Sequence, residues 1–243
     1  MRVFAKTDLG KARDMNEDFY FITGQNDFPK LYILADGMGG YNGGEIASRL
    51  ATDSVRRYIS SNFEQIEHDK ESILKLIGDA IEYANMVVYE KAKQVVELEN
   101  MGTTLEVCLI YNNKAFIGHI GDSRIYRIRK QIIRKITHDH SYVEKLVKDG
   151  TITKEEAQNH PKKNMLMKAL GCTAYVEPDL TIKGFLKEDI LVICSDGLTN
   201  MVSEEEIYDF VTQDFDNSCE KLVQRANQLG GYDNITVLVI KND

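Results

Sequence analysis

"TTLEVCLIYNNKAFIGHIGDSRIYRIRKQIIRKIT", residues 103–137, is the part of the chain from which the fold class follows most directly. Four short apolar runs alternate there with turn residues at 112–113, 121–124 and 129–131. Connections this short join antiparallel strands, because parallel strands need a crossover of a dozen or more residues. The stretch therefore predicts an antiparallel meander and argues against a doubly wound parallel sheet.

Helical and strand patterns alternate on both sides of this stretch. Apolar residues recur at helical spacing at Ile46, Leu50, Val55 and Ile59. Further helical patterns cover 70–98, 204–212 and 216–229, and apolar strands are predicted at 31–35, 180–184, 190–194 and 235–240. We therefore predict an α+β fold: a central antiparallel β-sandwich flanked by helices on both sides (α-β-β-α), with a polar, helical insertion at 139–171.

Composition narrows the class of protein. A chain of 243 residues that is 43% hydrophobic can bury one large core, and no linker is visible, so we predict a single domain over 1–243. A net charge of −8 argues against nucleic acid or an anionic membrane as the main partner. No apolar run is long enough to cross a bilayer, and no apolar signal region opens the chain. The four cysteines form no CxxC motif, which favours a reduced, cytoplasmic protein.

Acidic residues stand where apolar strands stop. Asp36 and Asp196 each end an apolar run and precede glycine, in "LYILADG" and "LVICSDG". Asp122 follows "AFIGHIG", Asp233 comes before the last strand, and "RDMNED" places Asp18 before another apolar run. A single Asp-Gly pair is an ordinary turn sequence, but repetition at strand ends is harder to explain by turns alone.

The ends of the strands in one sandwich can meet at one edge, and this would bring the acids together. Clustered carboxylates repel each other unless some protonate, and a divalent cation removes that conflict. Ligation by oxygen alone points to Mg²⁺ or Mn²⁺ rather than zinc, and the carbonyl of Gly37 could add one more oxygen. Arg13 lies close in sequence to the first acids and has the planar donor fork that suits phosphate, although a surface salt bridge fits its spacing equally well.

Six motifs occur in order along the chain: "RDMNED" at 13–18, "ADGMGG" at 35–40, "GTT" at 102–104, "GDSR" at 121–124, "SDGL" at 195–198 and "GYDNIT" at 231–236. With these motifs the chain resembles the metal-dependent protein serine/threonine phosphatases of the PPM, or type 2C, family, and most closely their compact bacterial members. The resemblance runs from about residue 1 to 240 and covers a single domain.

The resemblance implies a site with two Mn²⁺ or Mg²⁺ ions at one edge of the sandwich. It assigns Asp36 as the ligand shared by both ions, Gly37 as a carbonyl ligand, and Asp196 and Asp233 as the remaining ligands. Asp18 would hold metal-bound waters or support the ligands from behind. Arg13 would bind the phosphate, and Asp122 would hold a third, weaker ion. Glu17, Asn200 and Asn234 are expected to support these residues from behind, and 139–171 falls where bacterial relatives carry a mobile flap.

The implied reaction is hydrolysis of phosphoserine and phosphothreonine by a hydroxide that bridges the two ions and attacks phosphorus directly. The implied partners are phosphoprotein substrates, including a membrane serine/threonine kinase and its targets, and we expect a monomer. Three positions depart from relatives. Met38 and Tyr41 stand where different relatives carry a histidine, and Asn200 replaces an aspartate, which should weaken a third metal site.

Other classes of protein remain to be weighed against this one. A catalytically silent phospho-binding or scaffold protein of the same fold is the main alternative, but it has no reason to keep all of these acids. "CEKLVQR" at 219–225 matches the Cys-x5-Arg spacing of cysteine phosphatases, yet it lacks their glycine-rich loop. "HDH" at 138–140 hints at a metal, but no third ligand is spaced for zinc, and a loop or core role fits these histidines better.

Overall fold

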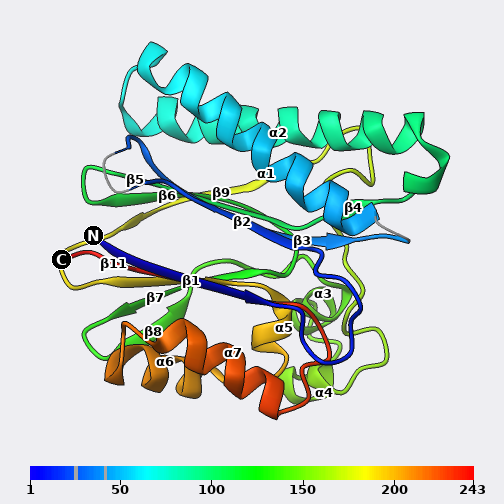
Figure 1. The fold of residues 1–243 in the computed structure, drawn as a ribbon, viewed down its shortest axis with the longest axis vertical. Helices are drawn as coiled ribbons and strands as arrows, with labels where there is room; N and C mark the ends of the chain where they lie inside the picture. The colour runs from blue at the N-terminus through cyan, green and yellow to red at the C-terminus, as the bar shows by residue number, and fades with distance from the viewer. Residues whose placement is uncertain (25–26, 41–42) are drawn as a thin grey trace.

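Two antiparallel sheets face each other in the computed structural model, which describes residues 1–24, 27–40 and 43–243 (Figure 1). One sheet has the order β1 (Arg2–Asp8), β11 (Ile235–Lys241), β10 (Ile190–Cys194), β7 (Arg124–Arg129) and β8 (Ile132–Lys135). The other has the order β2 (Asp18–Ile22), β3 (Lys30–Met38), β5 (Leu105–Tyr111), β6 (Lys114–Ile120) and β9 (Asp179–Gly184), and the short β4 (Gly102–Thr103) pairs with β3.

Helices cover the outer face of each sheet, as the α+β prediction requires (Figure 1). The long helices α1 (Gly43–Asn62) and α2 (Lys70–Gln94) lie over the β2–β9 sheet, and α6 (Glu204–Gln213) and α7 (Ser218–Gln228) lie over the other. The short helices α3 (Tyr142–Lys148), α4 (Lys154–Gln158) and α5 (Asp196–Thr199) gather at one end of the sandwich. Single 3₁₀ turns follow α1 at Phe63–Gln65 and α2 at Val96–Leu98.

The hydrophobic core has three parts, one between the sheets and one beneath each helical layer. Strand β3 contributes to two of them, because successive side chains of a strand point to opposite faces. Tyr32 and Leu34 pack between the sheets, whereas Leu31 and Ile33 pack under α1 and α2. A strand that is buried on both faces appears in the sequence as the unbroken apolar run "LYILA".

The predicted meander is wrong at one of its three connections. Asn112 and Asn113 have positive φ and close the β5–β6 hairpin, and Lys130 and Gln131 do the same for β7–β8. Residues 121–123, however, pass from one sheet to the other, so β6 and β7 are not paired. A short glycine-containing connection looks alike in sequence whether it closes a hairpin or changes sheets.

Other boundaries agree with the sequence patterns to within a few residues, except that the first two strands, Arg2–Asp8 and Asp18–Ile22, were not predicted. Within 139–171, only Tyr142–Lys148 and Lys154–Gln158 are helical, so this segment is less helical than its pattern indicates. All four cysteines are free thiols. Over the described ranges, no helix combines the length and apolar character needed to span a bilayer.

Candidate active site

The acids predicted from strand ends come together where the two sheets meet. Asp18 and Asp36 are direct cross-strand partners in β2 and β3, so their side chains share one sheet face. That face is the one carrying Tyr32 and Leu34, and it looks toward the opposite sheet. From the opposite sheet, Asp196 begins α5 directly after β10 and shares a side-chain hydrogen bond with Asp36.

Close main-chain packing explains why glycine follows aspartate in both motifs. A Cβ atom on Gly37 would collide with the main-chain oxygen of Gly44 and would lie 2.7 Å from that of Glu17. A Cβ on Gly197 would collide in the same way with the main-chain oxygen of Asn234. Neither glycine has a positive φ, so the hairpin-turn explanation of the Asp-Gly pairs is wrong. The glycines are needed because other segments of the site approach them closely.

Burial and mutual repulsion hold the carboxyl pKa values of the cluster high. Burial raises the pKa of Asp36 well above its usual range, and the charges of Asp18, Asp196, Asp122 and Asp233 add to that effect. Burial likewise raises the pKa of Asp18 to about 7, although hydrogen bonds from Thr236 and Ser195 oppose it. The pKa of Asp196 rises to about 6 through burial and the charge of Asp233. These carboxyl groups therefore need a proton or a cation between them at neutral pH.

The donor set fits a hard divalent cation. Asp18 Oδ1 is buried and has no hydrogen-bond partner, so a carboxylate oxygen is left to interact with something else. Among the described residues, no group of three or more His, Cys, Asp and Glu side chains is already arranged to hold one ion. Mg²⁺ is usually bound by only one or two carboxylates and keeps several waters, so pairs such as Asp36 and Asp196 fit it.

Asp122 lies at the sheet-crossing segment between β6 and β7, and its carboxyl interacts electrostatically with the cluster. Burial raises the pKa of Asp122 to about 7, with added repulsion from Asp196 and Asp139 and an opposing effect of Arg124. The carboxyl of Asp122 is therefore close enough to the acidic cluster for the charges to interact.

Arg13 lies beside the acidic cluster and is paired with one of its members. Its Nη2 donates to Asp233 Oδ2 at 2.8 Å, and its Nη1 lies 4.0 Å from Glu17 Oε2. The side chain of Arg13 is 46% exposed, so part of its donor fork still faces solvent. The salt bridge that the sequence left open exists, but its partner is an acid of the site.

The three predicted supporting residues each contact a segment that carries a site acid. Asn200 Nδ2 donates to Asp196 Oδ2 at 2.9 Å. Asn234 Oδ1 accepts the main-chain N–H of Glu17 at 2.8 Å, and its Nδ2 donates to the carbonyls of Leu9 and Met15, each at 2.9 Å. The carboxylate of Glu17 accepts a hydrogen bond from the main chain of Gly44. The loop that contains Arg13 is thus tied down by Asn234.

Hydroxyl residues that we did not predict hold the acids in place. Ser195 Oγ donates to Asp18 Oδ2 at 2.8 Å and accepts the main-chain N–H of Thr236 at 2.9 Å. Thr104 Oγ1 lies 3.0 Å from the main-chain nitrogen of Asp36 and 2.9 Å from Ser123 Oγ. These residues could have been predicted from the sequence, because each is the serine or threonine inside one of the motifs "SDG", "GTT" and "GDS".

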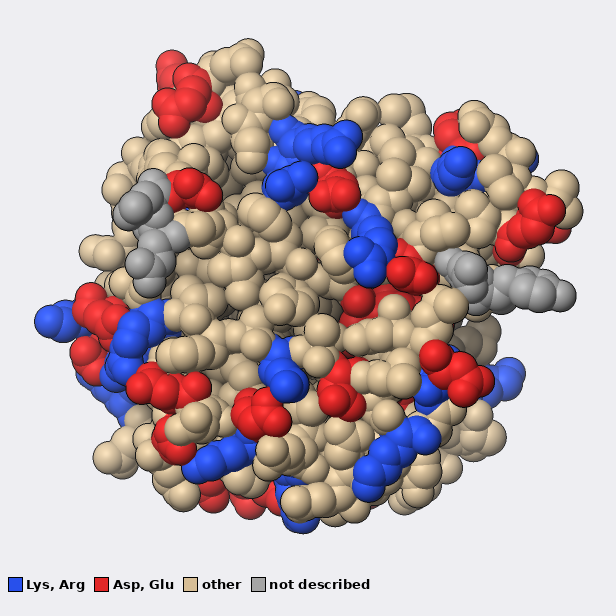
Figure 2. All heavy atoms as spheres, viewed as in Figure 1, with Lys and Arg blue, Asp and Glu red and all other residues tan. Residues whose placement is uncertain are grey.

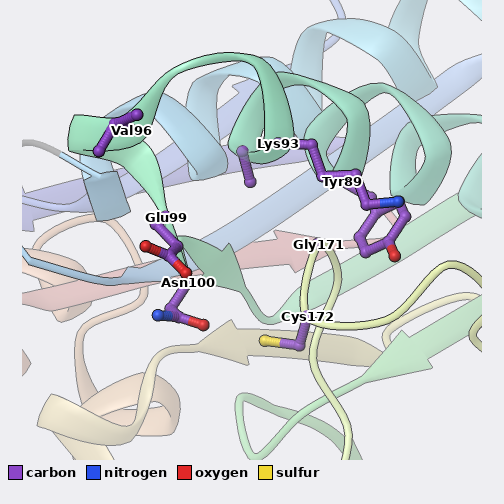
Figure 3. Close-up of a pocket in the computed structure, with 8 residues that line it drawn as sticks. Tyr89, Lys93, Val96, Glu99, Asn100, Gly171 and Cys172 are labelled. Carbon is purple, nitrogen blue, oxygen red and sulfur yellow. The ribbon is translucent and has the colours of Figure 1, made fainter.

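The remaining motifs do not form a second active site in the described residues. Cys219 lies within α7, and burial raises the pKa of its thiol to about 12, which rules out an activated nucleophile. A cavity of 370 Å³ lies beside the last turns of α2 (Figure 3). Its one thiol, Cys172, also has a pKa raised by burial. Met38 ends β3, and Tyr41 lies outside the described residues.

Charged side chains of both signs are interspersed over the face of the molecule seen in Figure 2. Many exposed charges of the molecule are paired with each other, for example Arg2 with Asp216 at 2.9 Å and Lys6 with Glu220 at 2.8 Å. Such exposed pairs contribute little to stability. They contrast with the acidic cluster, whose members are partly or fully buried and repel each other.

Comparison with known proteins identifies what this chain is similar to. The family model for protein phosphatase 2C matches residues 11–234. A protein named serine/threonine phosphatase stp, from Listeria monocytogenes, is 36% identical over 242 residues, which cover 98% of this chain and 94% of that protein. A solved serine/threonine phosphatase from S. agalactiae matches with a TM-score of 0.91 and 36% identity, covering 100% of this chain and 99% of that one.

A second solved structure carries information about metal. It is the catalytic domain of the phosphatase PstP in complex with two manganese ions, with a TM-score of 0.85 and 34% identity. The match covers 98% of this chain and 96% of that domain.

Proposed function

This chain belongs to the protein phosphatase 2C family and is a serine/threonine phosphatase, and from that premise we propose how its acidic cluster removes phosphate from phosphoserine and phosphothreonine. The proposal is hydrolysis by direct attack of a hydroxide, with two divalent cations, Mn²⁺ or Mg²⁺, held by the cluster. The catalytically silent scaffold, the alternative left open by the sequence, is not supported, because homologues over the whole chain are named as phosphatases.

One observation carries the proposal: buried carboxyl groups from both sheets raise each other's pKa, and Asp18 Oδ1 among them has no partner. We assign Asp36 as the ligand shared by the two ions, with the carbonyl of Gly37 and the carboxylates of Asp196 and Asp233 completing the set. When bound, the two ions would lower the pKa of a water between them and neutralise charge on the phosphate.

The chain's own groups would then orient the ligands and the substrate. Ser195, which donates to Asp18 Oδ2, leaves the other carboxylate oxygen of Asp18 available for waters on the ions. Asn200, which donates to Asp196 Oδ2, fixes the rotamer of that carboxylate. Asp233 would hold an ion through its carboxylate, beside Arg13, and the solvent-exposed part of the Arg13 guanidinium could bind two phosphate oxygens at once.

The proposed substrates are phosphoproteins, including a membrane serine/threonine kinase and its targets, on which the protein acts as a cytoplasmic monomer. Asp122 would hold a third ion more weakly, since Asn200 is neutral where an aspartate could have helped. The segment 139–171 would act as a flap beside the site.

Asp36→Asn and Asp196→Asn test the metal assignment, because each keeps the shape of the side chain and removes its charge. Hydrolysis of p-nitrophenyl phosphate should fall by about two or more orders of magnitude, as expected when a metal-activated nucleophile is lost. Mn²⁺ affinity, measured by titration with a spectroscopic readout of free ion, should fall with it. Asp53→Asn, an exposed substitution on α1, is the matched control and should change neither. Near-normal rates and Mn²⁺ titration in both site variants would overturn the assignment.

A further inference from the structure

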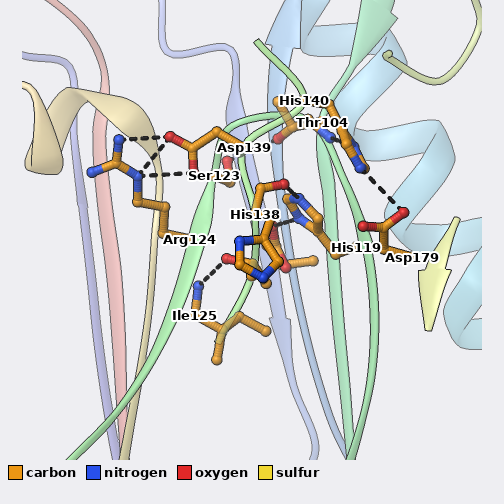
Figure 4. Close-up of polar contacts among 12 residues, drawn as sticks. Thr104, His119, Ser123, Arg124, Ile125, His138, Asp139, His140 and Asp179 are labelled. Atoms are coloured by element: carbon orange, nitrogen blue, oxygen red, sulfur yellow. Dashed lines mark hydrogen bonds and ion pairs between the residues drawn. The ribbon is translucent and has the colours of Figure 1, made fainter. Parts of the chain in front are cut away.

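Four ionisable side chains outside the acidic cluster form a row that we call the histidine row: Glu106, His119, His140 and Asp179. His119 on β6 stands directly opposite Glu106 on β5 and opposite Asp179 on β9, so the three side chains share one face of the sheet. His140 follows β8 of the other sheet, and its ring stacks on that of His119 with centroids 4.6 Å apart (Figure 4). The row therefore links the two sheets.

Both ring nitrogens of His119 are engaged. Nδ1 is hydrogen-bonded to the carboxyl group of Glu106, and both side chains are fully buried. Nε2 lies 2.8 Å from the carbonyl oxygen of His138, and because a carbonyl only accepts, this nitrogen carries the hydrogen. His119 is thus held in one orientation and offers a fixed surface on which His140 stacks.

His140 is bonded to Gly121 in both directions. Its main-chain N–H donates to the carbonyl of Gly121 at 2.7 Å, and its Nδ1 accepts the N–H of Gly121 at 3.1 Å. The ring hydrogen is then on Nε2, which lies 3.3 Å from Asp179 Oδ1. Burial and the neighbouring His119 lower the pKa of His140 to about 4, in keeping with a neutral ring that accepts at Nδ1.

Gly121 is the residue before Asp122, and its position leaves little freedom. Its φ is +110°, and a Cβ there would lie 2.5 Å from Thr104 Cγ2. Thr104 in turn bonds the main chain of Asp36. The orientation of Asp122 is therefore set by a glycine that is packed on one side and held by His140 on the other.

The same histidine also holds the segment 139–171. The carbonyl of His140 accepts the N–H of Met167 at 2.7 Å, and Ser141 forms an antiparallel bridge with Leu166. The outgoing and returning arms of the segment thus meet at His140. Asp179, which contacts Nε2, lies just after the segment on β9 and is also 3.6 Å from Lys168.

We propose that His140 is a positioning residue that fixes the Asp122 loop and the 139–171 segment relative to each other, while Asp179 and the Glu106–His119 pair hold its ring. The inference rests on the proposed function, because fixing Asp122 and this segment affects catalysis only if the acidic cluster beside them is the active site. It also accounts for the "HDH" motif without a metal. Both ring nitrogens of His119 and Nδ1 of His140 are hydrogen-bonded within the protein, and Nε2 of His140, which has no hydrogen bond, lies 3.3 Å from Asp179 Oδ1.

The test compares variants that remove different contacts of His140. His140→Phe keeps the stacking on His119 and loses both polar contacts. His140→Asn keeps an oxygen that can accept from Gly121 N–H and loses the contact with Asp179. Asp179→Ala removes that contact from the other side, at a residue whose side chain is 52% exposed and whose loss the fold should tolerate. His68→Phe is the matched control, because His68 stacks on Phe63 at 4.4 Å and bonds its carbonyl at 2.9 Å, in the connection between α1 and α2.

For His140→Phe we expect kcat on a phosphoserine peptide to fall about tenfold. The Mn²⁺ concentration that gives the half-maximal rate should rise about fivefold. Both changes are of the size expected for the loss of one buried hydrogen bond. Hydrolysis of p-nitrophenyl phosphate at saturating Mn²⁺ should stay within about twofold, since its leaving group needs little help. In the metal-free protein, amide exchange at Met167 should quicken about tenfold. His140→Asn should recover most of the peptide rate, Asp179→Ala should show a smaller loss in the same sense, and His68→Phe should show none.

The outcomes separate this inference from the function on which it rests. Equal losses on both substrates, no recovery in His140→Asn, or unchanged exchange over 141–167 in His140→Phe and Asp179→Ala would overturn the positioning role. The exchange measurement needs no metal and no turnover. If turnover by the wild-type protein did not depend on Mn²⁺, the proposed metal mechanism would be contradicted. The exchange result would still test the positioning role of His140.

Discussion

Replacement of Asn234 by alanine should lower the free energy of unfolding and release the loop that carries Arg13 and Glu17. Asn234 is only 4% exposed, and its side chain makes three hydrogen bonds to the main chain of residues more than 200 positions earlier. In the alanine variant, the N–H of Glu17 and the carbonyls of Leu9 and Met15 lose their partners together.

The size of the effect follows from these three bonds. A buried hydrogen bond contributes about 1 kcal/mol net, and leaving its partner unsatisfied costs about 1–3 kcal/mol, so we expect a loss of about 3 kcal/mol. That is a large share of the roughly 5–15 kcal/mol by which domains are stable. Asn234→Asp should lower the free energy of unfolding at least as much. The aspartate keeps the acceptor for the N–H of Glu17, but it replaces the Nδ2 donor with an oxygen that faces the carbonyl oxygens of Leu9 and Met15.

Urea unfolding with a chelator present measures this loss without a contribution from metal binding. Asn217→Ala is the control: its side-chain bonds to Asp214 are exposed, and the change should stay within about 0.5 kcal/mol. In the same Asn234 variant, KM for a phosphopeptide should rise, because the guanidinium of Arg13 is no longer held near the acids. A loss below about 1 kcal/mol with unchanged KM would refute this reasoning, since the three bonds would then contribute little either to the fold or to the loop.

Three further predictions concern single residues of the site and its surroundings. Arg13→Ala should raise KM for phosphopeptide by an amount equivalent to about 1.5–3 kcal/mol and leave Mn²⁺ affinity intact; unchanged kinetics would make the residue a salt-bridge partner only. Asp122→Ala should slow phosphopeptide hydrolysis far more than p-nitrophenyl phosphate hydrolysis, because a serine alkoxide needs a proton from an acidic water and p-nitrophenolate hardly does. Equal losses on the two substrates would instead mean that Asp122 supports the geometry of the whole site, or that His160 or another residue of 139–171 supplies the proton. Burial opposes ionisation of Asp139, but the ion pair with Arg124 outweighs burial and lowers the pKa of Asp139. The ionised carboxylate therefore stabilises the folded protein fully above about pH 4, and this contribution is lost as the pH falls through the lowered pKa. Asp139→Asn should therefore cost about 3 kcal/mol in urea unfolding at pH 7 and much less near pH 2.5, and a cost independent of pH would contradict the ion pair as its cause.

Local patterns were sufficient to predict most of the elements and the position of the acids at strand ends. The apolar run before Asp36 is a strand because it is buried on both faces, and the Asn112–Asn113 turn closes a hairpin because asparagine tolerates positive φ. Most strands and helices, the sandwich and the family followed from features that span fewer than about 20 residues and from the order of the six motifs. The roles of the individual metal ligands stay predictions until the substitutions above are made.

Contacts between distant segments could not be predicted in this way. The pairing of Arg13 with Asp233 joins residues 220 positions apart, and the sheet change at Gly121 depends on its packing against Thr104. The sequence suggested only a loop or core role for His140, yet it is hydrogen-bonded to both Gly121 and Met167. Spacing along a chain sets the direction of a side chain within its own strand or helix. Which partner that side chain then meets depends on the register of the strands and on how the two sheets pack, and these are settled only when distant segments bury their apolar faces against each other.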